Sequence, residues 1–173
     1  MDPYEFHSRC GWGYDHRSFI YSENGKVLKI FGPDDNDALS LLSKYIDVTF
    51  VTGDKKGFPI SRKRIEEDMN YKLHLVSTIR RIDWIPKNFI PEKVVYMGDG
   101  IFDHYVMRQV GYSIAPANAD QLAKLNASFV TDRNGGDRAV AEACLHLLEK
   151  FFVKYDPNKL PTIEGKDFGE WSI

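Results

Sequence analysis

The sequence predicts an α/β protein with a doubly wound, mainly parallel sheet. Three short apolar runs, VTFV (48–51), VVYM (94–97) and YSIA (112–115), have the length and composition of buried parallel strands. Segments with the apolar spacing of helices lie between them. Because parallel strands need crossover connections of one hand, this alternation favours a sheet with helices on both faces.

The other elements follow from local patterns. In residues 19–31, two β-branched and aromatic runs flank Asn24-Gly25, a dipeptide that suits the tight turn of a β-hairpin. The segment 34–45 has N-cap candidates followed by apolar residues on one helical face. The remaining pattern predicts helices over 61–69, 77–85, 103–110, 120–125 and 138–152, and a strand at 129–130.

Composition excludes several classes of protein. The chain has 173 residues, 43% of them hydrophobic, which is enough for one sizeable core, and its formal charge of −2 argues against nucleic acid as the main partner. Cys10 and Cys144 are too few for a disulfide framework. No apolar run approaches the roughly 18 residues that cross a bilayer, and the first residues lack the apolar stretch of a signal peptide, so we expect a cytoplasmic protein.

Two strand ends carry candidate ligand-binding residues, because ligands of such folds bind beyond the carboxyl ends of the strands. Thr52-Gly53 offers a hydroxyl and backbone N–H groups for a phosphate oxygen, although such a pair is more often only a turn. Asp99 and Asp103 follow strand 94–97, and their hard oxygen ligands suit Mg²⁺. The alternative for Asp103 is a plain helix N-cap.

Cations and glycines near the same edge leave two interpretations open. Arg80 and Arg81 stand at a predicted helix start, where they either contact an anion or lie on a solvated face. Gly135 and Gly136 are best explained as a structural turn before the last helix. The five histidines have no zinc-site spacing.

Together these stretches resemble the capless haloacid dehalogenase (HAD) superfamily, in particular its 3-deoxy-D-manno-octulosonate 8-phosphate phosphatases. The resemblance runs from Phe19 to about Phe152 through the hairpin, VTGDK, YMGDGIFDHYVMRQVGYSIAPANAD and FVTDRNGGDRAVAEACLHLL. It implies a Rossmann-type fold with a β-hairpin flap and no cap domain. It also implies Mg²⁺-dependent hydrolysis of a phosphorylated sugar acid, and a homotetramer in which hairpin and C-terminal arm reach a neighbour's site.

The resemblance also implies roles for the strand-end residues. Thr52, with Gly53, corresponds to the hydroxyl motif that binds phosphate. Asp99 corresponds to a Mg²⁺ ligand and Asp103 to its supporting carboxylate. The phosphate-binding cation falls on Arg80 or Arg81, where the family usually has Lys, and the two residue types are not interchangeable.

The first motif of the family is missing. Such phosphatases begin with an apolar strand ending in DxDG, in which the first Asp attacks phosphorus and the second is the general acid/base. Ungapped alignment puts Arg9 and Gly11 at these positions, and Asp15 lies too close to the hairpin to replace the nucleophile. We therefore expect no catalytic nucleophile and impaired hydrolysis. The alternatives are a catalytically inactive oligomerisation or binding module and the nonfunctional product of a damaged gene.

The same departure sets the expected division of the chain. Residues 1–18 are an aberrant N-terminal segment, 19–153 the HAD-like phosphatase domain and 154–173 an irregular C-terminal arm. Residues 1–18 mix few apolar side chains with Arg, His, Asp and Gly, which is poor material for a central strand buried on both faces. We expect this segment to form no ordered central strand.

A shifted reading frame explains the missing motif. One permitted set of codons for residues 9–18 is CGA TGT GGA TGG GGT TAT GAC CAC CGG TCN, which encodes RCGWGYDHRS. Read one base later, the same string encodes DVDGVMTTG, the missing motif, and it ends where the hairpin begins. We infer that residues 1 to about 18 are an out-of-frame reading of the ordinary first strand, through a nucleotide lost in the gene or in its sequencing.

Resequencing the genomic DNA across codons 9–19 tests this inference. The expected result is the codon string above, with or without one additional base. An uninterrupted frame that uses other codons would show that the N-terminal segment diverged without a frameshift.

Overall fold

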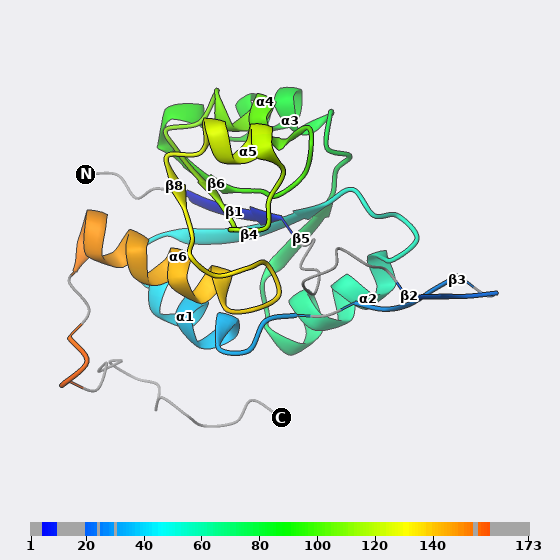
Figure 1. Cartoon of the computed structure of the whole chain (residues 1–173), viewed down its shortest axis with the longest axis horizontal. Coiled ribbons are helices and arrows are strands. Elements are labelled where there is room, and N and C mark those ends of the chain that lie inside the picture. The colour runs from blue at the N-terminus through cyan, green and yellow to red at the C-terminus, as the bar shows by residue number, and fades with distance from the viewer. Residues whose placement is uncertain (1–4, 10–19, 24, 30, 154–155, 160–173) are drawn as a thin grey trace.

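A six-stranded parallel sheet forms the centre of the computed structural model, which describes residues 5–9, 20–23, 25–29, 31–153 and 156–159 (Figure 1). The sheet order is β5-β4-β1-β6-β7-β8, and every neighbouring pair is parallel. The strands are β1 (Glu5–Arg9), β4 (Asp47–Thr52), β5 (Lys72–Leu75), β6 (Val94–Met97), β7 (Tyr112–Ala115) and β8 (Phe129–Val130). The predicted α/β class with a mainly parallel sheet is confirmed.

Helices cover both faces of this sheet. Helices α1 and α6 lie on one face and α3, α4 and α5 on the other (Figure 1). Their bounds are α1 (Asp35–Leu42), α2 (Phe58–Arg62), α3 (Arg81–Asn88), α4 (Asp103–Met107), α5 (Gln121–Asn126) and α6 (Ala139–Leu147), with π-helical turns η1 (Lys63–Asp68) and η3 (Leu148–Phe152) and the 3₁₀ turn η2 (Pro91–Lys93). None of the helices in the described residues combines the length and apolar character that a membrane crossing requires.

Each face of the sheet has its own apolar core. Leu39, Leu42 and Phe50 belong to the core under α1 and α6, whereas Val51 and Val106 belong to the core under α3 and α4. Phe50 and Val51 are consecutive in β4 and are each 1% exposed, because successive side chains of a strand point to opposite faces. This burial on both faces explains why β4, β6 and β7 are near-continuous apolar runs.

The expectation that residues 1–18 form no ordered central strand is wrong. Glu5–Arg9 forms β1, which lies between β4 and β6 and pairs with both. The reason is that a parallel ladder joins main-chain N–H and C=O groups, so β4 and β6 can be bridged by a sequence with few apolar side chains. The division of the chain at residues 18 and 153 stays a prediction, since residues 10–19 and 160–173 lie outside the described part.

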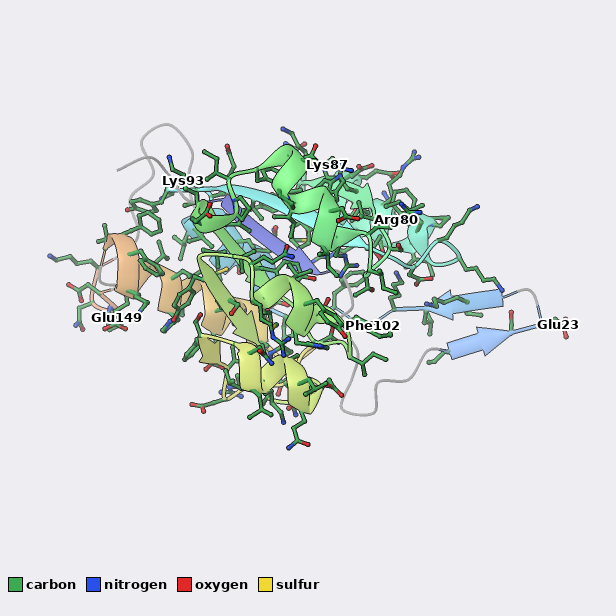
Figure 2. The ribbon with its side chains drawn as sticks, turned by 90° about the horizontal axis from the view of Figure 1, so that it is seen from above. Glu23, Arg80, Lys87, Lys93, Phe102 and Glu149 are labelled. Atoms are coloured by element: carbon green, nitrogen blue, oxygen red, sulfur yellow. The ribbon has the colours of Figure 1, made fainter. Side chains whose placement is uncertain are left out.

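Several other boundaries differ from the prediction: the helix expected over 61–69 begins at Phe58, and the one expected over 103–110 ends at Met107. Lys72–Leu75 forms the edge strand β5, which the sequence analysis did not predict, because Lys72 and His74 interrupt the apolar run that marks the buried strands. The helix expected over 77–85 begins at Arg81, after the loop that follows β5. The hairpin is confirmed as β2 (Ile20–Ser22) and β3 (Gly25–Leu28), where Gly25 has a φ of 114°. It projects away from the sheet, with Glu23 at its tip (Figure 2).

A buried carboxylate joins the amino ends of α1 and α6. Asp35 is 7% exposed, and its Oδ1 accepts a hydrogen bond of 3.1 Å from the backbone N–H of Ala141. Burial raises the pKa of Asp35 to about 6, which the hydrogen bond from Ala141 only partly offsets. On the surface beside it, Arg138 Nε lies 2.5 Å from Asp34 Oδ2.

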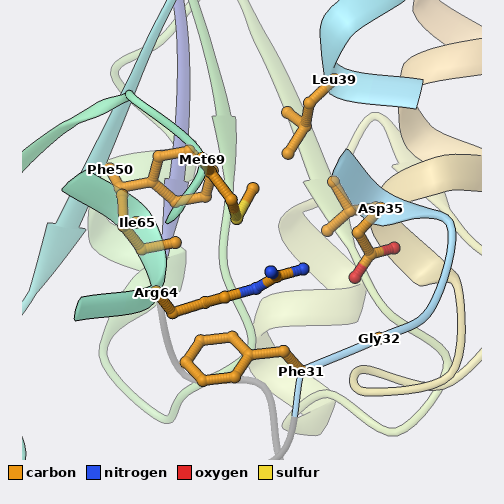
Figure 3. A pocket seen from close by; sticks show the side chains of 9 residues that line it. Phe31, Gly32, Asp35, Leu39, Phe50, Arg64, Ile65 and Met69 are labelled. Carbon is orange, nitrogen blue, oxygen red and sulfur yellow. The ribbon is translucent and has the colours of Figure 1, made fainter. Parts of the chain in front are cut away.

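Asp35 also lines a small cavity with Arg64, Phe31 and Met69 (Figure 3). The cavity measures about 10 Å³, which is near the lower limit for a single water molecule. It is therefore too small for a sugar phosphate, since ligand pockets measure several hundred Å³.

We expect Asp35→Asn to flatten the pH dependence of stability. The pKa of Asp35 is about 6 in the folded protein against an ordinary value of 3.8, so the folded state binds more protons between these values and stability falls as pH rises from about 4 to about 6. Asn keeps an acceptor for the Ala141 N–H and cannot ionise. Urea unfolding from pH 4 to pH 8 should show a fall on the order of 2 kcal/mol in the parent that is missing in the variant.

Asp37→Asn, an exposed change in the same helix, is the control and should keep the slope of the parent chain. An unchanged slope in Asp35→Asn would contradict the assignment.

Candidate functional site

The carboxyl ends of β4, β1 and β6 meet at the point where the order of the strands reverses. From β1 the sheet extends through β4 and β5 on one side and through β6, β7 and β8 on the other. Such a switch point leaves a crevice outside the strand ends, which is where ligands of open α/β sheets bind. The loops after Thr52 and after Met97 flank this crevice.

The pairing of β1 identifies the residue at its centre. Arg9 pairs with Val51, next to Thr52, and Ser8 pairs with Met97, next to Gly98. Arg9 is therefore the last residue of β1, at the register position between the two loops. Gly11, the second aligned position of the missing motif, lies outside the described residues.

Thr52 is buried at the end of β4, and the exposed Gly53 follows it. Thr52 is 1% exposed, and its Oγ1 accepts a hydrogen bond of 3.2 Å from the Asp54 N–H. Its carbonyl accepts one of 2.8 Å from the Val76 N–H, which brings the loop after β5 alongside. A Cβ on Gly53 would lie 3.4 Å from that loop's backbone at Ser77, an ordinary van der Waals contact, so the packing of the two loops does not by itself require glycine.

The Asp103 carboxylate organises the loop after β6. It is fully buried, and its Oδ2 accepts backbone hydrogen bonds from Asp99 (2.9 Å) and Gly100 (2.7 Å). The plain N-cap interpretation of Asp103 is wrong, because α4 begins at Asp103 itself, after Phe102. The carboxylate folds back and supports the turn that carries Asp99. A Cβ on Gly98 would lie 2.7 Å from Asp103 Cγ, so this position has room only for glycine.

The structure separates the two candidate arginines. Arg80 is exposed (Figure 2), whereas Arg81 is 0% exposed. Arg81 Nη1 lies 3.3 Å from Asp103 Oδ1 and donates a hydrogen bond of 3.0 Å to Tyr96 Oη. The Nε and Nη2 atoms of Arg81 are buried and make no hydrogen bond within the described part of the chain. Arg81, and not Arg80, is thus the cation that adjoins the loop of Asp99.

The described residues supply too few ligands for a complete Mg²⁺ site. Among them, no three His, Cys, Asp or Glu side chains gather where they could hold a metal ion. Both oxygens of Asp103 accept hydrogen bonds from other groups, so the other carboxylate of this loop, Asp99, is the one whose residue type and position suit a Mg²⁺ ligand. The residue at the end of β1 is Arg9, and an arginine side chain has no oxygen atom that could bind a metal ion.

Two lysines of the hairpin converge on Asp54, just after the Thr52-Gly53 turn. Lys26 pairs with Asp54, and Lys29 Nζ lies 3.0 Å from the same oxygen. Both lysine side chains are largely buried, at 2% and 8% exposure. Burial opposes ionisation of Asp54, but the hydrogen bonds from Lys26, Gly57 and Lys29 outweigh it and lower its pKa to about 2.

Sequence reasoning missed this cluster and Tyr96. The lysines lie far from Asp54 in the chain, and no periodic pattern joins a hairpin to a loop. Tyr96 is the polar member of an otherwise apolar strand, VVYM, and a phenol at a position predicted to be fully buried is a signal that could have identified it.

Comparisons with known proteins agree with this geometry. Residues 84–143 match the family of haloacid dehalogenase-like hydrolases. The chain is 35% identical over 135 residues to the 3-deoxy-D-manno-octulosonate 8-phosphate phosphatase KdsC of Salmonella typhi, covering 72% of this chain and 68% of that protein. Its identity to KdsC of Escherichia coli (strain K12) is 35% over 133 residues, with 72% and 68% covered.

Solved structures show the same architecture. A phosphatase of the same name from Yersinia pestis is 27% identical, with a TM-score of 0.69 over 84% of this chain and 80% of that one. The cobalt-bound deoxy-D-mannose-octulosonate 8-phosphate phosphatase of Haemophilus influenzae has a TM-score of 0.73 at 23% identity, over 86% and 88% of the two chains.

The parallel sheet with its strand-end loops defines a haloacid dehalogenase-like hydrolase fold without a cap domain, as the resemblance predicted. Within that superfamily, the chain belongs to the KdsC family of phosphatases.

We expect Asp54→Asn to destabilise the protein by about 2 kcal/mol or more at pH 7, because it leaves two buried ammonium groups without their carboxylate. The pKa of Asp54 is about 2 in the folded state, below its ordinary 3.8, so its stabilising effect is present above about pH 4 and is lost as pH falls toward 2. Urea unfolding at pH 7 and pH 2.5 should show the difference between parent and variant narrowing in acid.

Asp68→Asn is a matched control, since Asp68 also pairs with a lysine but is 42% exposed. An effect of Asp54→Asn no larger than that of the control would contradict a buried ion cluster.

Proposed function

We propose that this chain carries the phosphate-binding part of a sugar-acid phosphatase site and that its ligand is a phosphorylated sugar acid of the 3-deoxy-octulosonate 8-phosphate type. The names of its relatives support this ligand class. A related structure from Moraxella catarrhalis, 20% identical, holds a magnesium ion, a phosphate ion and KDO, and supports the same fold in that setting.

Three residues carry the phosphate in this proposal. The Thr52 hydroxyl and the backbone of Gly53 contact its oxygens at the end of β4. Arg81 offers Nε and Nη2, which are buried, cationic and without a hydrogen-bond partner in the described residues. An oxyanion is the ligand that satisfies two parallel N–H donors of one guanidinium at once.

Hydrolysis in this family proceeds by attack of an aspartate on phosphorus, followed by attack of water on the aspartyl-phosphate. The attacking carboxylate belongs at the carboxyl end of the first strand. The pairing of β1 puts Arg9 there, and this observation carries the proposal that the chain does not hydrolyse its ligand. Without the nucleophile the route has no first step, so the chain as spelled binds its ligand and does not turn it over.

A second candidate is an inactive module that assembles with further copies of the chain. Exposed apolar side chains beside the crevice favour it, since Ile101 is 56% exposed, Phe102 41% and Tyr105 46% (Figure 2). By resemblance, such an assembly would be a homotetramer.

Restoring the first motif should create a phosphatase. The variant has residues 9–17 replaced by DVDGVMTTG, which supplies two carboxylates beside Asp99 and so completes the oxygen ligands that Mg²⁺ takes. We expect the restored chain to release phosphate from an aryl phosphate only with Mg²⁺, at a rate at least about 10⁴-fold above the chain as spelled.

The control is the restored chain with Asn at position 9, which keeps the strand and removes the nucleophile. It should match the chain as spelled. Magnesium-dependent turnover by the unaltered chain would contradict the absence of a nucleophile. If the restored chain shows no turnover, the inactive module is favoured, and light scattering would then give the mass of its assembly.

A further inference from the structure

We propose that Tyr96 is a positioning residue for the oxyanion: together with Asp103, its hydroxyl holds one end of the Arg81 guanidinium, so that the buried donors of the opposite edge are kept for the ligand. This inference rests on the phosphate site proposed above and deepens it. Tyr96 need not touch the ligand, because it acts through Arg81.

The first argument is the burial of the phenol. Tyr96 lies in β6 and is 0% exposed, within the apolar core that includes Val51, Ile85 and Val106. A phenylalanine would fill nearly the same space without burying an oxygen. Burial of a hydroxyl costs on the order of 2 kcal/mol unless its hydrogen bonds are made, so its contacts must compensate for that cost.

Those contacts have fixed directions. A carboxylate only accepts and a guanidinium only donates, so the Tyr96 hydroxyl donates to Asp103 Oδ1 at 2.8 Å and accepts from Arg81 Nη1 at 3.0 Å. The direct contact from Arg81 Nη1 to Asp103 Oδ1 is longer, at 3.3 Å. The Tyr96 hydroxyl, Arg81 Nη1 and Asp103 Oδ1 therefore form a triangle in which each atom contacts the other two.

In this arrangement, one edge of the Arg81 guanidinium has no hydrogen-bond partner in the described residues. Nη1 is held by Tyr96, whereas Nε and Nη2 are buried and have no hydrogen-bond partner in the described residues. The Nε–H and one Nη2–H of a guanidinium point the same way and form the fork that binds two oxygens of a phosphate or carboxylate. Each buried donor without a partner costs about 1–3 kcal/mol, which an oxyanion would relieve.

Loss of the hydroxyl would have a specific consequence. Arg81 Nη1 already lies 3.3 Å from Asp103 Oδ1, and without the Tyr96 hydroxyl as a second anchor for Nη1 the guanidinium can turn its fork onto the Asp103 carboxylate. That pairing would satisfy the buried donors inside the protein and withdraw them from the ligand. The change should therefore weaken ligand binding while leaving thermal stability unchanged or higher, a combination that mere damage to the core would not produce.

The test is calorimetric titration of the full chain with inorganic phosphate, with thermal unfolding of each variant. We expect Tyr96→Phe to weaken phosphate binding about tenfold or more with no fall in Tm. Tyr112→Phe is the matched control, because Tyr112 lies in β7, outside the crevice loops, and its hydroxyl is hydrogen-bonded to His146. This variant should bind phosphate like the parent. Arg81→Lys keeps the charge without the fork and should weaken binding at least as much.

Each outcome decides the matter. Phosphate binding by the parent and equally by Tyr96→Phe overturns the role of Tyr96 and leaves the proposed site intact. No binding by the parent overturns the proposed site itself, and the inference falls with it. If Tyr96→Phe does not fold, the ¹⁵N-bound Nε–H signal of Arg81 in the parent is followed instead: phosphate must shift it if the fork binds the anion, and an unshifted signal overturns the inference.

Discussion

The hydrogen-bond ladder that joins β4 to β6 through β1 is the constraint on which the site depends. It consists of main-chain groups, and it aligns the ends of three strands so that their loops open on one crevice. A ladder of this kind depends weakly on which side chains it carries, which explains how an atypical segment can occupy the centre of the sheet. The same ladder makes Arg9 the last residue of β1, at the register position between the loops after β4 and β6.

Asp103 shows how one buried carboxylate can serve the site without contacting a ligand. It accepts hydrogen bonds from the backbone of the Asp99 turn at one oxygen and from Tyr96 at the other, with Arg81 alongside. The carboxylate thereby joins β6, α3 and α4 at their ends nearest the crevice. A buried charge is tolerated when every lone pair is engaged. These hydrogen bonds hold the turn that carries Asp99 in one conformation.

The hairpin is joined to the crevice by charge. Lys26 and Lys29 reach from β3 to Asp54, directly after the Thr52-Gly53 turn, and their burial makes this contact stronger than an ion pair on the surface. These ion pairs stabilise the hairpin against the rest of the protein, since a two-stranded hairpin alone is only marginally stable in water. The hairpin and the segment Thr52–Asp54 are consequently linked, and a change in either is expected to affect the other.

The sequence by itself determined the alternation of strands and helices, the hairpin at Asn24-Gly25 and the strand-end positions of Thr52 and Asp99, because these depend on local periodicity and turn chemistry. It also showed that the first motif is missing. Only the tertiary structure decided that Glu5–Arg9 is the central strand, that Arg81 rather than Arg80 adjoins the site, and that Tyr96 joins it. These depend on which main-chain edges remain to be paired and on which side of α3 meets the sheet, and both are set by contacts between segments far apart in the chain.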